Sequence, residues 1–139
     1  MYSEADFCTV IVKSLDLGFK IPDPTSDFEK TVKRVFDGFG VLQGVPIYWE
    51  AKLTKGLKSL NLQEIREHQI DALIEYKKAL PNCHAWIIWC VTVKAGEHRV
   101  YIFEDPFEIK RRRDNKENIL KKELVTLPYK LVKKGKVDF

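Results

Sequence analysis

The chain contains little of what marks several large classes of protein. Its 139 residues include only 3 Cys and 3 His. The cysteines lack the paired spacing of zinc ligands, so we expect reduced thiols rather than disulfides or a zinc site. There is no apolar run of about 18 residues and no signal peptide, so we expect no membrane association. The absence of a glycine-rich phosphate loop and of a nucleophile elbow argues against a nucleotide cofactor and against acyl-transfer chemistry.

Charge is unevenly distributed along the chain. The whole chain carries a net charge of +4, whereas residues 110–136 contain 11 Lys or Arg and 3 Asp or Glu, a net of +8. The remaining residues therefore carry a net of −4. Such a run is usually a solvated helix face, but beside an acidic site it also suits a phosphate backbone. We therefore expect a core over residues 1–109 and a basic C-terminal extension, residues 110–139, packed on the same domain.

Residues 37–52 predict a β-hairpin that brings two acids together. With Gln43-Gly44 as a two-residue turn, Asp37 lies opposite Glu50, and Lys52 shares the face of Glu50. Opposed like charges destabilise a sheet, and a bound divalent cation is the commonest reason for keeping them. The hairpin is therefore either a metal site with a lysine beside it or a solvated edge that happens to carry charge.

Residues 61–80 predict a helix that begins with a capping box at Asn61 and Glu64. Gln69 falls inside its apolar stripe, where an amide needs hydrogen-bond partners. It is either a satisfied core glutamine or a group that holds a metal or its water. Ile70 and Ile74 form a second patch, for the core or for a subunit contact. The main stripe consists of Leu62, Ile65, Ala72, Leu73, Tyr76 and Leu80.

A second capping box, Ser3 with Asp6, begins a helix over residues 4–15. Its buried face contains Phe7, and Glu4 projects on the same side. Glu4 either interacts favourably with the helix dipole or supplies an outer carboxylate to the acidic site.

Residues 84–93 are almost continuously apolar, as in a central strand covered on both faces. Trp86 and Trp89 lie within this strand, which favours a core role over base stacking. A further strand follows at 99–103, and an early one is expected at 18–21. The predicted order is helix, strand, loop, hairpin, helix, two strands and a helical tail. This order indicates an α/β fold, with a mixed central sheet flanked by helices.

The segments Glu50-Ala51-Lys52, Thr54-Lys55 and Glu67-His68-Gln69 resemble the RecU-type Holliday-junction resolvases of the PD-(D/E)xK nuclease superfamily. In that family an F-E-A-K-E-T-K stretch is followed by an H-E-H-Q helix. The archaeal Hjc resolvases have a similar order of elements. This chain lacks the long stalk insertion of the family and has only a loop over residues 22–36. It also has Val35 where the family has a threonine. The resemblance implies a restriction-endonuclease-like core whose active-site residues are Asp37, Glu50, Lys52, Gln69 and Glu4.

The resemblance further implies a metal-dependent endodeoxyribonuclease that resolves Holliday junctions or other branched DNA in recombination and repair. It would act as a homodimer in the cytoplasm of a bacterium or of a phage-infected host. Mg²⁺ would be held by Asp37, Glu50 and Gln69, and we expect Mn²⁺ to substitute. Two alternatives are a restriction-like, flap or duplex nuclease of the same superfamily and a DNA-binding module without turnover. Candidate DNA contacts are Ser26, Lys30, Lys33, Arg34, Lys55, Arg111, Arg112 and Arg113.

Overall fold

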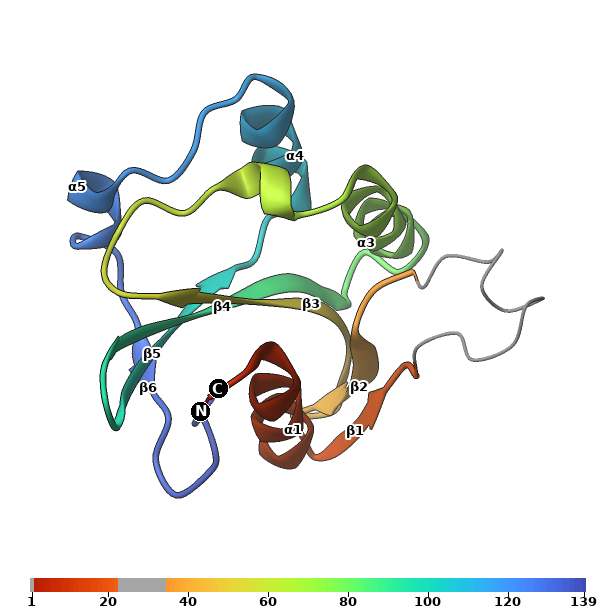
Figure 1. The fold of residues 1–139 in the computed structure, drawn as a ribbon. Coiled ribbons are helices and arrows are strands. Elements are labelled where there is room, and N and C mark those ends of the chain that lie inside the picture. The colour runs from red at the N-terminus through yellow and green to blue at the C-terminus, as the bar shows by residue number, and fades with distance from the viewer. Residues whose placement is uncertain (1, 23–34) are drawn as a thin grey trace, which may run out of the picture.

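Six strands form one mixed sheet in a computed structural model that describes residues 2–22 and 35–139 (Figure 1). The β3–β4 pair is parallel and the other neighbouring pairs are antiparallel. The predicted α/β class with a mixed sheet is therefore confirmed. In spatial order the strands are β1 Leu17–Lys20, β2 Gly38–Leu42, β3 Val45–Lys55, β4 His84–Lys94, β5 Glu97–Phe103 and β6 Lys130–Leu131.

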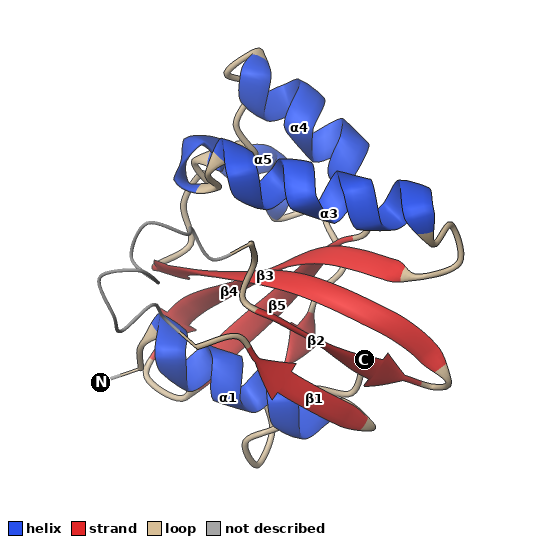
Figure 2. Cartoon of the chain, turned by 90° about the vertical axis from the view of Figure 1, so that its right-hand side faces the viewer, coloured by secondary structure: helices blue, strands red, loops and turns tan. Residues whose placement is uncertain are grey.

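Helices cover both faces of this sheet. Helix α1 lies on one face, and α3, α4 and α5 lie on the other (Figure 2). Helix α3 connects β3 to β4, as parallel neighbours require a crossover. None of the described helices is long and apolar enough to cross a bilayer. The helical segments are α1 Glu4–Ser14, the 3-10 turn η1 Leu62–Glu64, α3 Glu67–Ala79, α4 Pro106–Asp114 and α5 Lys121–Leu124.

The β2–β3 hairpin has the predicted turn and register. Gln43 and Gly44 have φ angles of 51° and 78°, the left-handed pair that a tight hairpin turn needs. Gly38 pairs with Trp49. Trp49 and Ala51 are fully buried in the core beneath α1. Alternation along β3 therefore directs Glu50 and Lys52 toward the face covered by α3.

The helix predicted over residues 61–80 begins later than expected. The Oδ1 atom of Asn61 accepts the N–H of Gln63 and caps only the three-residue turn η1. The chain is extended again at Ile65, and α3 begins at Glu67. Two of the residues that defined the predicted stripe thus precede the helix.

This later start changes which residues of α3 are buried. Ile70 and Ile74, expected as a separate patch, belong to the core. Tyr76 and Leu80, expected in the core, are 39% and 44% exposed. The predicted stripe is aligned on Leu62 and Ile65. Because both residues precede α3, their positions do not indicate which face of the helix is buried.

The other core predictions hold. Trp86 and Trp89 are buried, and the Nε1 atom of Trp89 donates to the hydroxyl of Thr54 at 2.8 Å. Cys8, Cys83 and Cys90 are buried and free.

The C-terminal residues contribute to both cores. Ile119 and Leu124 pack in the core under α3, and Val137 packs in the core under α1. The expected division after residue 109 lies inside α4.

We predict that Gly38→Ala strongly destabilises the protein. A Cβ atom at this position would lie 2.2 Å from the Trp49 ring and 2.4 Å from the carbonyl oxygen of Phe19. Overpacking of this kind costs about 1–3 kcal/mol or more. Gly56→Ala is the control, because its φ of +83° costs about 1–2 kcal/mol but its surroundings are open. Urea unfolding should rank Gly38→Ala as the more destabilised variant; equal loss would show that the hairpin yields easily at Trp49.

Candidate metal centre

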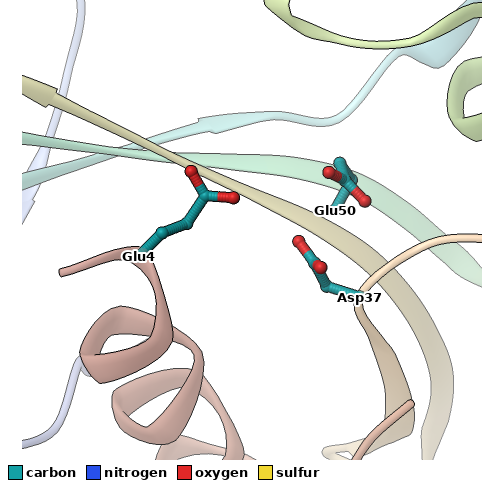
Figure 3. A group of neighbouring side chains, drawn as sticks. All are labelled: Glu4, Asp37 and Glu50. Atoms are coloured by element: carbon teal, nitrogen blue, oxygen red, sulfur yellow. The ribbon is translucent and has the colours of Figure 1, made fainter. Parts of the chain in front are cut away.

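Three acids from separate elements converge beside the start of β2. Glu4 comes from the first turn of α1, Asp37 immediately precedes β2, and Glu50 lies in the middle of β3 (Figure 3). One carboxylate oxygen from each residue lies within 4.8 Å of those of the other two. Asp37 and Glu50 are buried, at 2% and 1% exposure, and Glu4 is the more accessible member. We call these three residues the acidic cluster.

Asp37 is held by its backbone and by its side chain, but not as a simple cross-strand partner of Glu50. Its N–H donates to the carbonyl of Trp49 at 3.1 Å, and its own carbonyl accepts the N–H of Ile21 at 2.8 Å. Its Oδ2 atom accepts the N–H of Ala51 at 2.8 Å. The regular pairing therefore ends at Gly38, and the Asp37 carboxylate takes a β3 donor that a backbone carbonyl would otherwise use. The predicted proximity of the two acids results, although the predicted direct opposition does not.

Helix α1 supplies Glu4 rather than Asp6 to the cluster. Ser3 and Asp6 form the predicted capping box, with the Ser3 N–H donating to Asp6 at 2.9 Å and the Asp6 N–H donating to Ser3 at 3.1 Å. Asp6 is therefore committed to the helix end. Glu4 extends from the same turn toward the other two carboxylates (Figure 3).

Glu50 is the most strained member electrostatically. Burial raises its pKa to about 8, with a further upward contribution from Asp37 and an opposing one from Lys52. The Lys52 Nζ atom lies 3.3 Å from Oε2 of Glu50. The other oxygen, Oε1, is buried and has no hydrogen-bond partner among the described residues. A buried acceptor without a donor is unfavourable, so this position of Glu50 needs a further partner.

The cluster fits a divalent cation. Its donor atoms are all carboxylate oxygens, which hard cations such as Mg²⁺ prefer. A cation among them would give Glu50 Oε1 a partner and offset the repulsion between the acids.

Gln69 already has a structural partner. It is buried in the first turn of α3, where its Oε1 atom accepts the N–H of Arg66 at 3.0 Å. This bond satisfies one of the donors at the helix start. The carbonyl oxygen that would have to bind a metal is thus engaged with the helix.

The predicted DNA contacts are only partly within the described chain. Lys55 is exposed at the end of β3. Ser26, Lys30, Lys33 and Arg34 lie outside the described residues.

The three arginines of α4 are engaged within the fold. Arg111 pairs with Glu108 at 2.6 Å and with Glu117 at 3.1 Å. Arg112 pairs with Glu123 at 2.7 Å. Arg113 donates to the carbonyl of Ile65 at 2.6 Å and pairs with Asp114 at 3.2 Å.

A count of charges in the sequence does not show which of them are paired. Glu108 precedes Arg111 by three residues, a spacing that places both on one face of a helix and signals such a pair. The pair of Arg112 with Glu123 spans two elements, and no local spacing indicates it.

A comparison with protein families agrees with the motif resemblance. A family model described as Recombination protein U matches residues 25–136. No curated protein matches the chain. Among solved structures, the chain is similar to Hjc, a Holliday junction resolvase from the archaeal hyperthermophile Archaeoglobus fulgidus, with 9% identity and a TM-score of 0.36. That similarity covers 60% of this chain and 60% of the archaeal one.

We predict that the metal-free protein loses stability as pH rises toward 8. The pKa of Glu50 is about 8 in the folded chain against an ordinary value of 4.5, so between these values the folded state holds a proton that the unfolded state has lost. The stabilisation is complete below the lower value and disappears as pH passes the higher one, with a slope of up to about 1.4 kcal/mol per pH unit. Urea unfolding with a chelator from pH 4.5 to 8 measures it.

Glu50→Gln is the matched variant for this measurement. The glutamine does not titrate. The free energy of unfolding should therefore fall more steeply with pH in the wild type than in the variant across this window. Identical slopes would show that Glu50 ionises near its ordinary pKa.

Proposed function

The chain belongs to the Recombination protein U family, and we propose that it is a metal-dependent endodeoxyribonuclease that resolves Holliday junctions or other branched DNA. The observation that carries this proposal is the acidic cluster with Lys52 beside Glu50. Its arrangement is the acid, acid-x-Lys pattern that the sequence resemblance implied. We further propose that it acts in recombination and repair, in the cytoplasm of a bacterium or of a phage-infected host.

Glu4, Asp37 and Glu50 would hold one or two Mg²⁺ ions, for which Mn²⁺ would substitute. A bound cation of this kind polarises a phosphoryl oxygen and lowers the pKa of a bound water. The chain's own contribution is to fix the oxygens in advance: the Ala51 N–H holds Asp37, and burial within the sheet holds Glu50. Such preorganisation avoids rearrangement during the reaction.

Lys52 supplies the positive charge nearest to Glu50. Its side chain is only 12% exposed, and its Nζ atom lies 3.3 Å from Glu50. From this position it would orient or deprotonate the attacking water, or stabilise negative charge that develops on the phosphate. Gln69 would act through its amide N–H groups on a metal-bound water, because its Oε1 atom already accepts the Arg66 N–H. Direct ligation, as expected from the sequence, would use the second lone pair of Oε1.

We propose that several parts of the chain contact DNA. Ser26, Lys30, Lys33 and Arg34 stand in the chain just before Asp37, and we propose that they contact the branch point. Lys55 lies on the strand that carries Glu50 and Lys52, and would contact backbone phosphate. Of the three α4 arginines, Arg111 is the most exposed, at 51%, and would release Glu108 or Glu117 to reach DNA.

Cutting a two-fold symmetric junction on paired strands calls for two copies of the site, and hence for a symmetric dimer. An apolar face beside the cluster suits this contact. Leu17, Phe19 and Phe39 are 54%, 46% and 40% exposed, and the two phenylalanine rings stack at 5.2 Å. In the described chain, β1 pairs with a strand on one edge alone.

These three side chains alone are too small a surface for a stable dimer, so we infer that the contact continues toward α3. A standard interface buries about 800 Å² per partner, more than those three side chains expose. Tyr48, which pairs with Phe39, contacts the exposed Tyr76 in a tilted arrangement, with 4.4 Å between the ring centroids. We propose that a second copy of the chain covers this continuous surface, from Leu17 to Tyr76.

We predict that Asp37→Asn and Glu50→Gln each reduce cleavage of a labelled four-way junction by about 100-fold or more, since each removes an oxygen ligand that carries charge. Lys52→Ala should also lose most turnover. Binding to the same junction with a chelator should persist in all three variants. Glu75→Gln, on the exposed side of α3, is the charge-matched control and should cut normally.

Near-wild-type cutting by either acid variant would remove the cluster from the mechanism. The same assay with linear duplex and flap DNA, with and without Mg²⁺, separates the substrates. Equal cutting of junction and linear duplex would leave a general nuclease instead of a resolvase.

For the dimer, we predict that Phe39→Glu yields a monomer in analytical ultracentrifugation, because it buries a charge in the apolar contact. Val125→Glu changes an exposed apolar residue at the end of α5; it is the control and should remain dimeric. A monomeric wild type, or a dimeric Phe39→Glu variant, would contradict the assignment of this face.

A further inference from the structure

The basic side chains of the C-terminal extension differ in whether an acid pairs with them. In α4, Lys110 contacts Asp71, and the three arginines that follow each pair with an acid. Lys133, Lys134 and Lys136 lie in a separate turn after β6, and none of them forms a salt bridge within residues 2–22 and 35–139. This turn therefore brings together three positive charges that no acid of the described residues pairs with. Lys116, Lys121, Lys122 and Lys130 likewise form no salt bridge there, but they are spread over the surface.

This turn is well defined. Lys133 and Lys136 exchange backbone hydrogen bonds of 2.8 and 3.1 Å. Lys134 and Gly135 between them have φ angles of 52° and 73°, which give a two-residue hairpin turn. We call residues 133–136 the lysine turn; it follows β6 as the dark blue loop in Figure 1.

Both ends of the lysine turn are anchored. Before it, the N–H of Val132 donates to the carbonyl of His98 at 3.1 Å. After it, the N–H of Val137 donates to the hydroxyl of Ser14 at 2.8 Å, and the Val137 side chain is buried under α1. The lysine side chains therefore extend from a fixed backbone, so the entropy lost on binding is limited to the side chains.

The lysine turn forms one wall of a depression at the end of α1. The hollow has a volume of about 440 Å³ and is lined by Lys13 of α1 together with Lys133 and Lys136. Among the described residues that line it, Asp138 is the one acid. Three cations around a concave surface attract an anion with several oxygens more strongly than the same charges on a convex surface, because concave walls concentrate the field.

We propose that this depression binds the phosphodiester backbone of DNA and supplies most of the salt-dependent affinity that was expected from the α4 arginines. The inference rests on the proposed nuclease function for the identity of the anion. Helix α1 connects the two sites, because it carries Glu4 at its start and Lys13 near its end. Nine residues of helix span roughly 14 Å, or about four base pairs along a duplex. A duplex arm that reaches the cluster is thus long enough to reach the depression.

The test is the salt dependence of binding by the Lys133→Gln/Lys136→Gln double variant, measured with a labelled linear duplex and a chelator present. Each lost phosphate contact flattens the slope of log K against log salt by about 0.9, so a flattening of nearly two units is expected. Lys121→Gln/Lys122→Gln removes the same charge from α5 in the same extension, and its slope should stay close to that of the wild type. Lys133→Arg/Lys136→Arg should retain the full slope.

Equal flattening in both glutamine variants would show a general charge effect and overturn the proposal, as would an unchanged slope in the Lys133/Lys136 variant. Cleavage of a four-way junction by the wild type is measured separately. Normal cleavage with an unchanged slope refutes the depression alone. If the wild type cuts no DNA but the Lys133→Gln/Lys136→Gln variant shows the flattened slope, the nuclease function is refuted and the binding surface is retained.

Discussion

The repulsion between Asp37 and Glu50, held together out of contact with water, is the constraint that the surrounding structure serves. Two carboxylates in such a place destabilise the folded chain unless something compensates. The fold supplies part of the compensation through Lys52 and through the Ala51 N–H. The compensation is incomplete, because the buried Oε1 atom of Glu50 has no hydrogen-bond partner among the described residues. Departures of this kind from the usual rules of stability concentrate where proteins function.

The local backbone around the cluster follows from that constraint. Gly38 allows Trp49 to lie flat against the start of β2, and this contact brings Asp37 alongside β3. The Ser3–Asp6 capping box fixes the first turn of α1, so that Glu4 enters from a rigid element. The tight turn of the hairpin, Gly38 and the cap of α1 thus bring together three acids from separate parts of the sequence.

Much of this arrangement was predictable because it depends on local rules. The Gln43-Gly44 turn, the register of the hairpin and the cap of α1 are all determined by neighbours in the sequence. The start of α3 was not predictable in the same way, because Asn61 is an equally good cap for a short 3-10 turn as for a helix. The engagement of Arg112 by Glu123 depends on the packing of α4 against the residues that follow, which sequence spacing does not encode. For the same reason, a count of charges over residues 110–136 does not distinguish the paired arginines of α4 from the unpaired lysines of the lysine turn.

The hairpin also has a consequence for the order of events in folding. Asp37 and Glu50 are separated by a single tight turn, so their encounter requires closure of only a short loop, a process of about 1–10 μs for a hairpin. Pairing of β3 with β4 must wait for α3 to form and cross the sheet, and such non-local contacts are slower. We therefore expect the two acids to meet while water still surrounds them, and their cost to arise when the core buries them, because burial is the largest cause of the raised pKa of Glu50. We therefore expect protons or divalent cations to act on the later step, in which the core closes over the two acids.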